Sequence, residues 1–200
     1  MKFSALILAG GRSSRMQDPN MVEFIEKGLV KLHDKPLVSW VISALPTNTE
    51  QIYISANTSH NIYSRYGRVV PDDVRYGEYS GPLAGIASAL KVCDSDWLYV
   101  VPVDVPRPPS HILQGLQEYV NDSGSHLAYI DTTLGLQPLF MLIHKNMYKY
   151  IDESVIGGTK RVRKWLMRYG KPHSINVKED DFFNINTPAD LERAHSIISA

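Results

Sequence analysis

Apolar and polar positions recur along the chain with two different periods. Residues 5–9 form a wholly apolar run, which is typical of a strand buried on both faces of a parallel sheet. Similar short runs predict strands at 51–55, 68–70 and 97–101, and near 127–130 and 138–143. Helical spacing predicts helices at 36–45, 82–92, 109–120, near 146–151, at 161–169 and from Thr187 onward. This order predicts an α/β fold with a mostly parallel sheet flanked by helices, as a single domain over residues 1–200.

Four of the predicted strands end in glycine or in a short polar residue. Gly10 and Gly11 follow the first strand, Asn57 follows the second, Asp72 the third and Asp104 the fourth. In open α/β sheets the ligand lies outside the carboxyl ends of the parallel strands. We therefore expect these four segments to converge on one pocket.

The first of these segments carries features suited to phosphate. Two glycines let the backbone approach a ligand closely, and Arg12 and Arg15 add cationic donors. The spacing fits neither a P-loop nor a G-x-G-x-x-G fingerprint, and a bare pair of glycines is equally compatible with a plain turn. The two arginines directly after an apolar strand favour phosphate contact.

Several motifs together resemble a known family. The segments LAGGRSSRM at 8–16, KGL at 27–29 and KPL at 35–37 are similar to the signature of GT-A-like nucleotidyltransferases. The segments GPLAG at 81–85 and NINTP at 184–188 look specifically like the molybdenum cofactor guanylyltransferases, and the resemblance runs from residue 5 to about 195. It implies a Rossmann-like fold of the GT-A type that transfers GMP from GTP to the phosphate of molybdopterin, with Mg²⁺ as cofactor and pyrophosphate as leaving group.

The resemblance also implies roles for individual positions. Lys27 matches the signature lysine that contacts the nucleotide phosphates, and Asp104 matches the magnesium-binding aspartate. The remaining positions implied to bind the nucleotide are Leu8, Ala9, Gly10, Gly11, Asn57 and Asp72. Partners that hand over molybdopterin or accept the finished cofactor, including molybdoenzymes, are implied in the same way.

Physical chemistry supports Asp104, Lys27 and Arg15 as catalytic residues. Transfer of a nucleotidyl group gathers negative charge around one phosphorus, so positioning and electrostatic neutralisation are the main contributions of the protein. Asp104 at a strand end can hold Mg²⁺, while Lys27 and Arg15 would neutralise the transferred and leaving phosphates. Asn186 is either a second metal ligand or a turn residue ahead of the Thr187 cap.

Two features depart from the family pattern. Residues 17–26 are longer than the usual short turn, and Glu26 rather than aspartate precedes Lys27, so this loop acts as a lid over the phosphates or displaces the lysine. The Asp72-Asp73 doublet leaves two choices for the nucleotide contact, and alignment through the preceding Val-Val-Pro favours Asp72.

Five cations gather in residues 160–168 of an otherwise neutral chain. One reading is a solvated helix face. The other is a docking patch for the anionic phosphate of the pterin, with Lys160 and Arg161 nearest the site.

Composition narrows the range of function classes. Lys plus Arg (21) equals Asp plus Glu (21), so we expect neither a nucleic-acid partner nor an anionic membrane surface. The sequence shows no apolar run long enough to cross a bilayer and no secretory leader, which predicts a cytoplasmic protein. The single cysteine, Cys93, is expected to be a small core residue, and the spacing of the histidines gives no indication of a zinc site.

Two rival functions remain open at this point. Another nucleotidyltransferase of the same fold would use CTP or UTP with a sugar or polyol phosphate. A protein of a different class would bind GTP without turnover and assist the maturation of molybdoenzymes. The presence of both Lys27 and Asp104 favours an enzyme.

Overall fold

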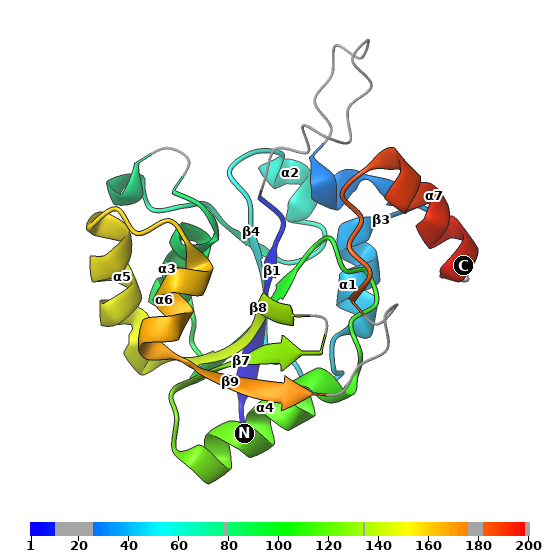
Figure 1. Ribbon diagram of the computed structural model, residues 1–200. Helices are drawn as coiled ribbons and strands as arrows, with labels where there is room; N and C mark the ends of the chain where they lie inside the picture. The colour runs from blue at the N-terminus through cyan, green and yellow to red at the C-terminus, as the bar shows by residue number, and fades with distance from the viewer. Residues whose placement is uncertain (11–25, 78–79, 134, 176–181, 199–200) are drawn as a thin grey trace.

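A computed structural model of the protein describes residues 1–10, 26–77, 80–133, 135–175 and 182–198. Its centre is a seven-stranded sheet in the order β5-β4-β1-β6-β8-β7-β9 (Figure 1). The bounds of these strands, in chain order, are β1 (Phe3–Leu8), β4 (Ile52–Ser55), β5 (Arg68–Val70), β6 (Trp97–Pro102), β7 (Leu127–Thr132), β8 (Gly135–His144) and β9 (Lys171–Ile175). A separate two-stranded hairpin pairs β2 (Lys31–Leu32) with β3 (Lys35–Pro36).

The direction of the strands confirms the predicted fold class. Strands β5, β4, β1 and β6 are mutually parallel, while β8 runs antiparallel to both β6 and β7. Strand β9 lies parallel to β7 at the edge of the sheet. The sheet is therefore mostly parallel, with β8 as the reversed strand.

Helices cover both faces of the sheet (Figure 1). The α-helices are α1 (Leu37–Ala44), α2 (His60–Tyr63), α3 (Pro82–Val92), α4 (His111–Ser123), α5 (Tyr148–Ile156), α6 (Val162–Tyr169) and α7 (Pro188–Ile197). Short 3₁₀ helices are η1 (Lys27–Leu29), η2 (Val74–Tyr76) and η3 (Lys145–Met147).

Alternation of side chains along β1 divides the core in two. Phe3, Ala5 and Ile7 belong to the core shared with α1, α4 and α7, whereas Leu6 and Leu8 belong to the core shared with α3, α5 and α6. All six residues of β1 are buried, as expected for a central strand with helices on both sides. The two cores hold the carboxyl ends of β1 and its neighbours rigidly in place.

The predicted elements agree with the structure except in a few places. The helix predicted at 82–92 and the strand predicted at 68–70 have the predicted bounds. Pro36 is the N-cap of α1 and ends β3, so it does not occupy the first helical turn as predicted. Cys93 is only partly buried as the C-cap of α3, not a core residue, because the chain leaves the helix there.

Within the described part of the chain, no helix is both long and apolar enough to span a membrane.

Candidate active site

The carboxyl ends of four parallel strands place the predicted segments along one edge of the sheet. Gly10 follows β1, Asn57 follows β4, Asp72 follows β5 and Asp104 follows β6. Because these strands are neighbours in the order β5-β4-β1-β6, the four segments lie side by side at this edge. That all four segments line one pocket stays a prediction.

Three residues from distant parts of the chain meet at the end of β6. The amino group of Lys27 donates to Asp104 Oδ2 at 2.8 Å and to Asn186 Oδ1 at 2.6 Å. The side chains of Lys27 and Asp104 are 17% and 22% exposed, so the pair is sheltered but reachable from solvent. The structure thus brings together three of the residues that the sequence predicted for charge neutralisation and metal binding.

Asn186 is held in this position by the start of α7. Its backbone N–H donates to Asp190 Oδ2 at 2.9 Å, and Thr187 and Asp190 form a reciprocal capping box around the first turn. The hydrogen bond from the Asn186 backbone N–H, and then those from Thr187, lower the pKa of Asp190. The adjoining backbone N–H of Ile185 donates to the Asp104 carbonyl oxygen at 2.9 Å, which ties the two segments together. Asn186 therefore has the turn role through its backbone, while its side chain contacts Lys27.

The lysine segment is anchored by a buried acid that the sequence did not single out as functional. Glu26 is 7% exposed, and its Oε1 accepts a hydrogen bond from the Thr58 hydroxyl. Two residues later, a Cβ on Gly28 would lie 2.6 Å from the Tyr63 hydroxyl, so the lack of a side chain at Gly28 allows this approach of η1 to α2. Burial and the nearby Glu26 carboxylate raise the pKa of Tyr63. The position of Glu26 beside the signature lysine was the one signal in the sequence.

Asn57 and Asp72 form a second pair, at the ends of β4 and β5. The Asn57 amide donates to Asp72 Oδ2 at 3.0 Å, and its carbonyl oxygen accepts from the Asp72 backbone N–H at 2.8 Å. Burial raises the pKa of Asp72. The two residues predicted to contact the nucleotide therefore act as one unit.

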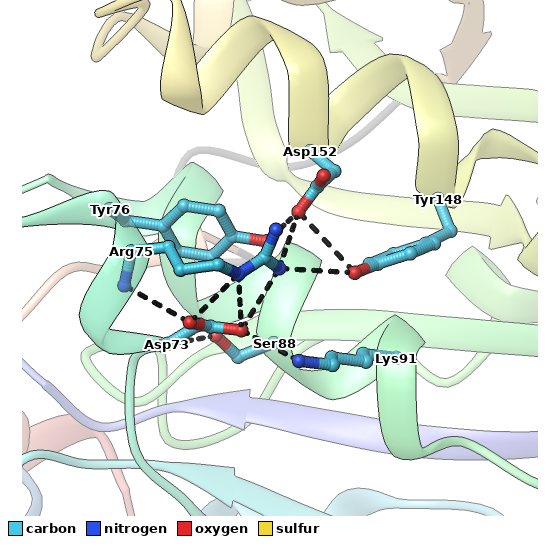
Figure 2. A network of polar contacts seen from close by, with 7 residues as sticks. All are labelled: Asp73, Arg75, Tyr76, Ser88, Lys91, Tyr148 and Asp152. Atoms are coloured by element: carbon cyan, nitrogen blue, oxygen red, sulfur yellow. Dashed lines mark hydrogen bonds and ion pairs between the residues drawn. The ribbon is translucent and has the colours of Figure 1, made fainter.

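Asp73, the other member of the doublet, belongs to a different set of contacts (Figure 2). Both of its carboxylate oxygens accept from Arg75, and Oδ2 also accepts from Lys91 at 2.8 Å. The hydrogen bonds from Arg75, and then that from Lys91, lower the pKa of Asp73. Its backbone N–H donates to Ser88 Oγ on α3 at 2.8 Å. With its side chain committed in this way, Asp73 is poorly placed to serve a ligand, and Asp72 is the better candidate.

Arg75 extends these contacts to α5. Its guanidinium donates to Asp152 at 2.9 Å, and Asp152 Oδ1 also accepts from the Tyr76 hydroxyl at 2.6 Å and from the Tyr148 hydroxyl at 3.3 Å. Figure 2 shows the guanidinium between the two carboxylates, one from the loop before η2 and one from α5. These contacts connect the loop after β5 to α5 at the protein surface.

The GPLAG segment has two glycines with separate structural reasons. Gly81 precedes α3 with φ +74°, a conformation that glycine adopts without strain. At Gly85 a Cβ would lie 2.2 Å from Ser55 Oγ, so α3 packs directly on the end of β4 because this residue lacks a side chain. Gly85 thus lets α3 approach the end of β4, two residues before Asn57.

The first loop is described only as far as Gly10. The backbone N–H groups of Ala9 and Gly10 both donate to the Ser55 carbonyl oxygen, at 3.1 and 2.8 Å, and the Leu8 carbonyl accepts from Val103. These two amides are therefore used within the sheet, and amides for a phosphate would come from later in the loop. Gly11, Arg12 and Arg15 lie outside the described residues.

The cationic segment before α6 begins beside the start of α3. A Cβ on Gly81 would lie 3.3 Å from the Lys160 carbonyl oxygen, and the side chains of Lys160 and Arg161 are exposed. On α6, Val162, Trp165 and Leu166 are buried while Arg163, Lys164 and Arg168 are exposed. The helix itself thus has the solvated cationic face of the first reading, and Lys160 and Arg161 precede it on the side of the GPLAG segment.

The oxygens around Lys27 also fit a magnesium ion. Carboxylate and amide oxygens are ligands that Mg²⁺ accepts, and Asp104 Oδ2 and Asn186 Oδ1 already converge on one cationic atom. Among the described residues, no three His, Cys, Asp or Glu side chains group to hold a metal ion. Water and substrate phosphate oxygens would therefore have to complete the coordination, as is usual for Mg²⁺.

Comparison with known proteins gives consistent results. A family model described as MobA-like NTP transferase domain matches residues 5–173. The chain is 32% identical over 199 residues to the molybdenum cofactor guanylyltransferase of Aliivibrio fischeri, covering 98% of this chain and 96% of that one. It is 33% identical over 190 residues to the protein of the same name from Mannheimia succiniciproducens, covering 94% and 96%. The solved structure of the molybdopterin-guanine dinucleotide biosynthesis protein A from Archaeoglobus fulgidus has a TM-score of 0.73 at 22% identity, covers 97% of each chain and shares the fold.

Proposed function

The chain belongs to the family of MobA-like NTP transferases, and on that premise we propose that it joins GMP from GTP to the phosphate of molybdopterin. An oxygen of the molybdopterin phosphate bonds to the α-phosphorus of GTP, and the bond from that phosphorus to the β-phosphate oxygen breaks, so that pyrophosphate leaves. The family identifies the chain as a nucleotidyltransferase, as the LAGGRSSRM, KGL and KPL segments predicted. The relatives named molybdenum cofactor guanylyltransferase match over nearly their full length and support the choice of GTP.

The observation that carries the proposal is the meeting of Lys27, Asp104 and Asn186. One amino group and two oxygens from three distant segments lie within hydrogen-bond distance at the end of a central strand. Such an arrangement supplies a positive charge to the phosphates and oxygen ligands to a cation in the same place. These are the groups that nucleotidyl transfer requires.

Each group has a distinct role in the proposed reaction. Lys27 neutralises charge on the phosphates as the pentacoordinate arrangement forms, and Asp104 and Asn186 would hold Mg²⁺. When bound, the ion would supply positive charge to the phosphate oxygens and orient them. The Asn57 and Asp72 pair holds the nucleoside end, and Lys160 and Arg161 are proposed to meet the pterin phosphate. Arg15 and the glycines of the first loop complete the proposed phosphate contacts.

The cation, substrates, location and partners are proposed on the basis of the same family. NTP transferases of this kind use a divalent cation, and we propose Mg²⁺ because the oxygen donors around Lys27 suit it. GTP and molybdenum-loaded molybdopterin are the proposed substrates, and the cytoplasm is the proposed location. Proteins that supply molybdopterin or receive the product are proposed as transient partners.

A nucleotide competition series tests the proposal. The purified protein is incubated with Mg²⁺, molybdenum-loaded molybdopterin and each of GTP, ATP, CTP and UTP, and pyrophosphate release is measured. We expect release with GTP that depends on the acceptor and is lost when Mg²⁺ is chelated.

Two other results would point to the rivals. Release with CTP or UTP and a sugar or polyol phosphate would identify a different nucleotidyltransferase of this fold. Tight GTP binding without any pyrophosphate would indicate a non-catalytic maturation subunit.

A further inference from the structure

Glu26 is an unusual residue to find in the interior. Acidic side chains are almost never fully buried unless they are paired, yet Glu26 is only 7% exposed. The hydroxyl of Thr58 donates a hydrogen bond to Glu26 Oε1, and burial together with the nearby Glu26 carboxylate raises the pKa of Tyr63. Removing a carboxylate from water costs free energy unless hydrogen bonds within the protein compensate for the lost hydration.

The residues that hydrogen bond to each other, Glu26 and Thr58, are each adjacent in the sequence to a residue of the candidate site. Glu26 directly precedes Lys27, whose amino group contacts Asp104 and Asn186. Thr58 directly follows Asn57, whose side chain is paired with Asp72. The bond therefore joins the segment that carries the predicted phosphate contact of Lys27 to the segment that carries the predicted nucleotide contact of Asn57.

A second contact reinforces the same connection. The absence of a side chain at Gly28 lets η1 approach the Tyr63 hydroxyl, and Tyr63 lies on α2, directly after the Thr58 segment. Tyr63 is fully buried. The lysine segment thus rests on residues 58–63 at two points, one polar and one steric.

We propose that Glu26 is a positioning residue, which through its hydrogen bond with Thr58 sets the distance between Lys27 and Asn57 so that both reach the same nucleotide. This inference rests on the proposed function. Glu26 itself touches neither substrate nor metal in this account. It acts by holding the Lys27 segment and the Asn57 segment at a fixed separation on either side of the nucleotide site.

Removal of the Thr58 hydroxyl tests the proposal with little change in shape. We expect Thr58→Val to lower kcat/KM for GTP about tenfold, because the Lys27 and Asn57 segments would no longer be joined by this hydrogen bond. Thr58→Ser keeps the hydroxyl and should stay within about twofold of the unaltered protein. Thr49→Val is the matched control, since it removes a part-buried threonine hydroxyl that donates to the Pro46 carbonyl, away from the site.

A double-mutant cycle separates positioning from general stability. Glu26→Ala and Thr58→Val should each lower kcat/KM, and the double variant should be no worse than Glu26→Ala alone because both remove one bond. Thr49→Val should lower the melting temperature by a similar amount without lowering kcat/KM. Glu26→Gln retains an acceptor oxygen and should recover part of the loss even if Glu26→Ala folds poorly.

Several outcomes would overturn the proposal. They are an unchanged kcat/KM in Thr58→Val, no recovery in Thr58→Ser, or independent effects that multiply in the double variant. If the unaltered protein releases no pyrophosphate, the proposed function fails, and calorimetric GTP binding decides the positioning role. Tenfold weaker binding in Thr58→Val would then support it, and equal or undetectable binding in both proteins would overturn it.

Discussion

Two polar clusters near the carboxyl ends of the parallel strands are built from similar contacts, and we propose different roles for them. In the Lys27 cluster (Lys27, Asp104 and Asn186), one cation meets two oxygens at 2.8 and 2.6 Å. In the Arg75 cluster, defined by the residues of Figure 2, one cation meets Asp73 and Asp152 at 3.0 and 2.9 Å. The lengths of these contacts alone do not distinguish a functional cluster from a structural one.

What distinguishes them is where they lie and what else they contact. The Arg75 cluster joins a surface loop to α5, and each carboxylate in it accepts hydrogen bonds from several protein groups. The Lys27 cluster lies at the end of the central strand β6 and draws its members from segments 77 and 159 residues apart. Separation along the chain does not distinguish the two clusters, because Arg75 and Asp152 are also 77 residues apart. The difference lies in the end of β6 as the place of the Lys27 cluster and in the smaller number of protein groups that its carboxylate contacts.

The largest expected effect is on catalysis, from loss of the Asp104 charge. Asp104→Asn keeps the shape of the side chain but should lower kcat for pyrophosphate release by about 10²–10³. The melting temperature should change little, because the ion pair is partly exposed. Asp122→Asn, at an exposed position on α4, is the matched control and should leave kcat unchanged. A large loss of stability with normal kcat would show that the Lys27 cluster stabilises the fold and takes no part in catalysis.

Loss of the lysine charge should have the next largest effect. Lys27→Met should lower kcat/KM for GTP by about 10², since the phosphates lose their neutralising partner. Lys31→Met, at an exposed lysine in the following hairpin strand, provides the comparison. Equal kinetics in the two variants would contradict the role given to Lys27.

The Arg75 cluster should show the opposite response, in stability rather than in rate. Asp73→Asn removes the charge that Arg75 and Lys91 share and should lower the melting temperature by roughly 4 °C, with kcat nearly unchanged. Thermal scans across pH, compared with the unaltered protein, measure this difference. A loss of kcat comparable to that of Asp104→Asn would remove the distinction between the clusters.

The pH dependence of that difference has a defined sign. Because the pKa of Asp73 is lowered on folding, its contribution to stability is complete above the unfolded pKa of about 3.9. The contribution is lost as pH falls through the folded pKa. The gap in melting temperature between the two proteins should therefore be constant from about pH 5 upward and shrink below about pH 4.

Loss of the N-terminal cap of α7 should lower both the stability and kcat, and it should give the smallest effect of these variants. Thr187→Ala removes one half of the capping box and should cost about 1 kcal/mol, or roughly 2 °C in melting temperature. Because Asn186 precedes this cap, kcat should also fall, but far less than in Asp104→Asn. Ser110→Ala is the control, since Ser110 is the N-cap of α4 without a side-chain cap hydrogen bond. Equal loss of stability in the two variants would contradict the capping role.

The central part of the fold could be predicted from the sequence because its elements carry strong local patterns. Strand β1 is a wholly apolar run, and α3 has proline at its start and helical spacing throughout. Strand β9 was not predicted, because KPHSI is polar and contains proline, and it forms only by pairing at the edge of the sheet. The hairpin of β2 and β3 turns at His33 and Asp34 with positive φ, without the glycine or asparagine that marks such turns.

The sequence named candidate residues for the site but not the contacts between them. Strand ends pointed to Asn57, Asp72 and Asp104, since parallel strands bring their carboxyl ends together. The contact of Lys27 with Asn186 depends on packing between residues 159 positions apart, for which no local pattern exists. Glu26 was taken as a departure in a loop, because burial of an acid depends on its partner, and Thr58 gave no signal of that role.

Isotope tracing tests the central claim most directly. The protein is given GTP labelled with ³²P at either the α- or the γ-position, together with Mg²⁺ and molybdenum-loaded molybdopterin, and the products are separated. The account predicts that the α-label enters the pterin product and that the γ-label leaves as pyrophosphate. Transfer of the γ-label to the acceptor, or release of labelled inorganic phosphate without a pterin nucleotide, would contradict nucleotidyl transfer.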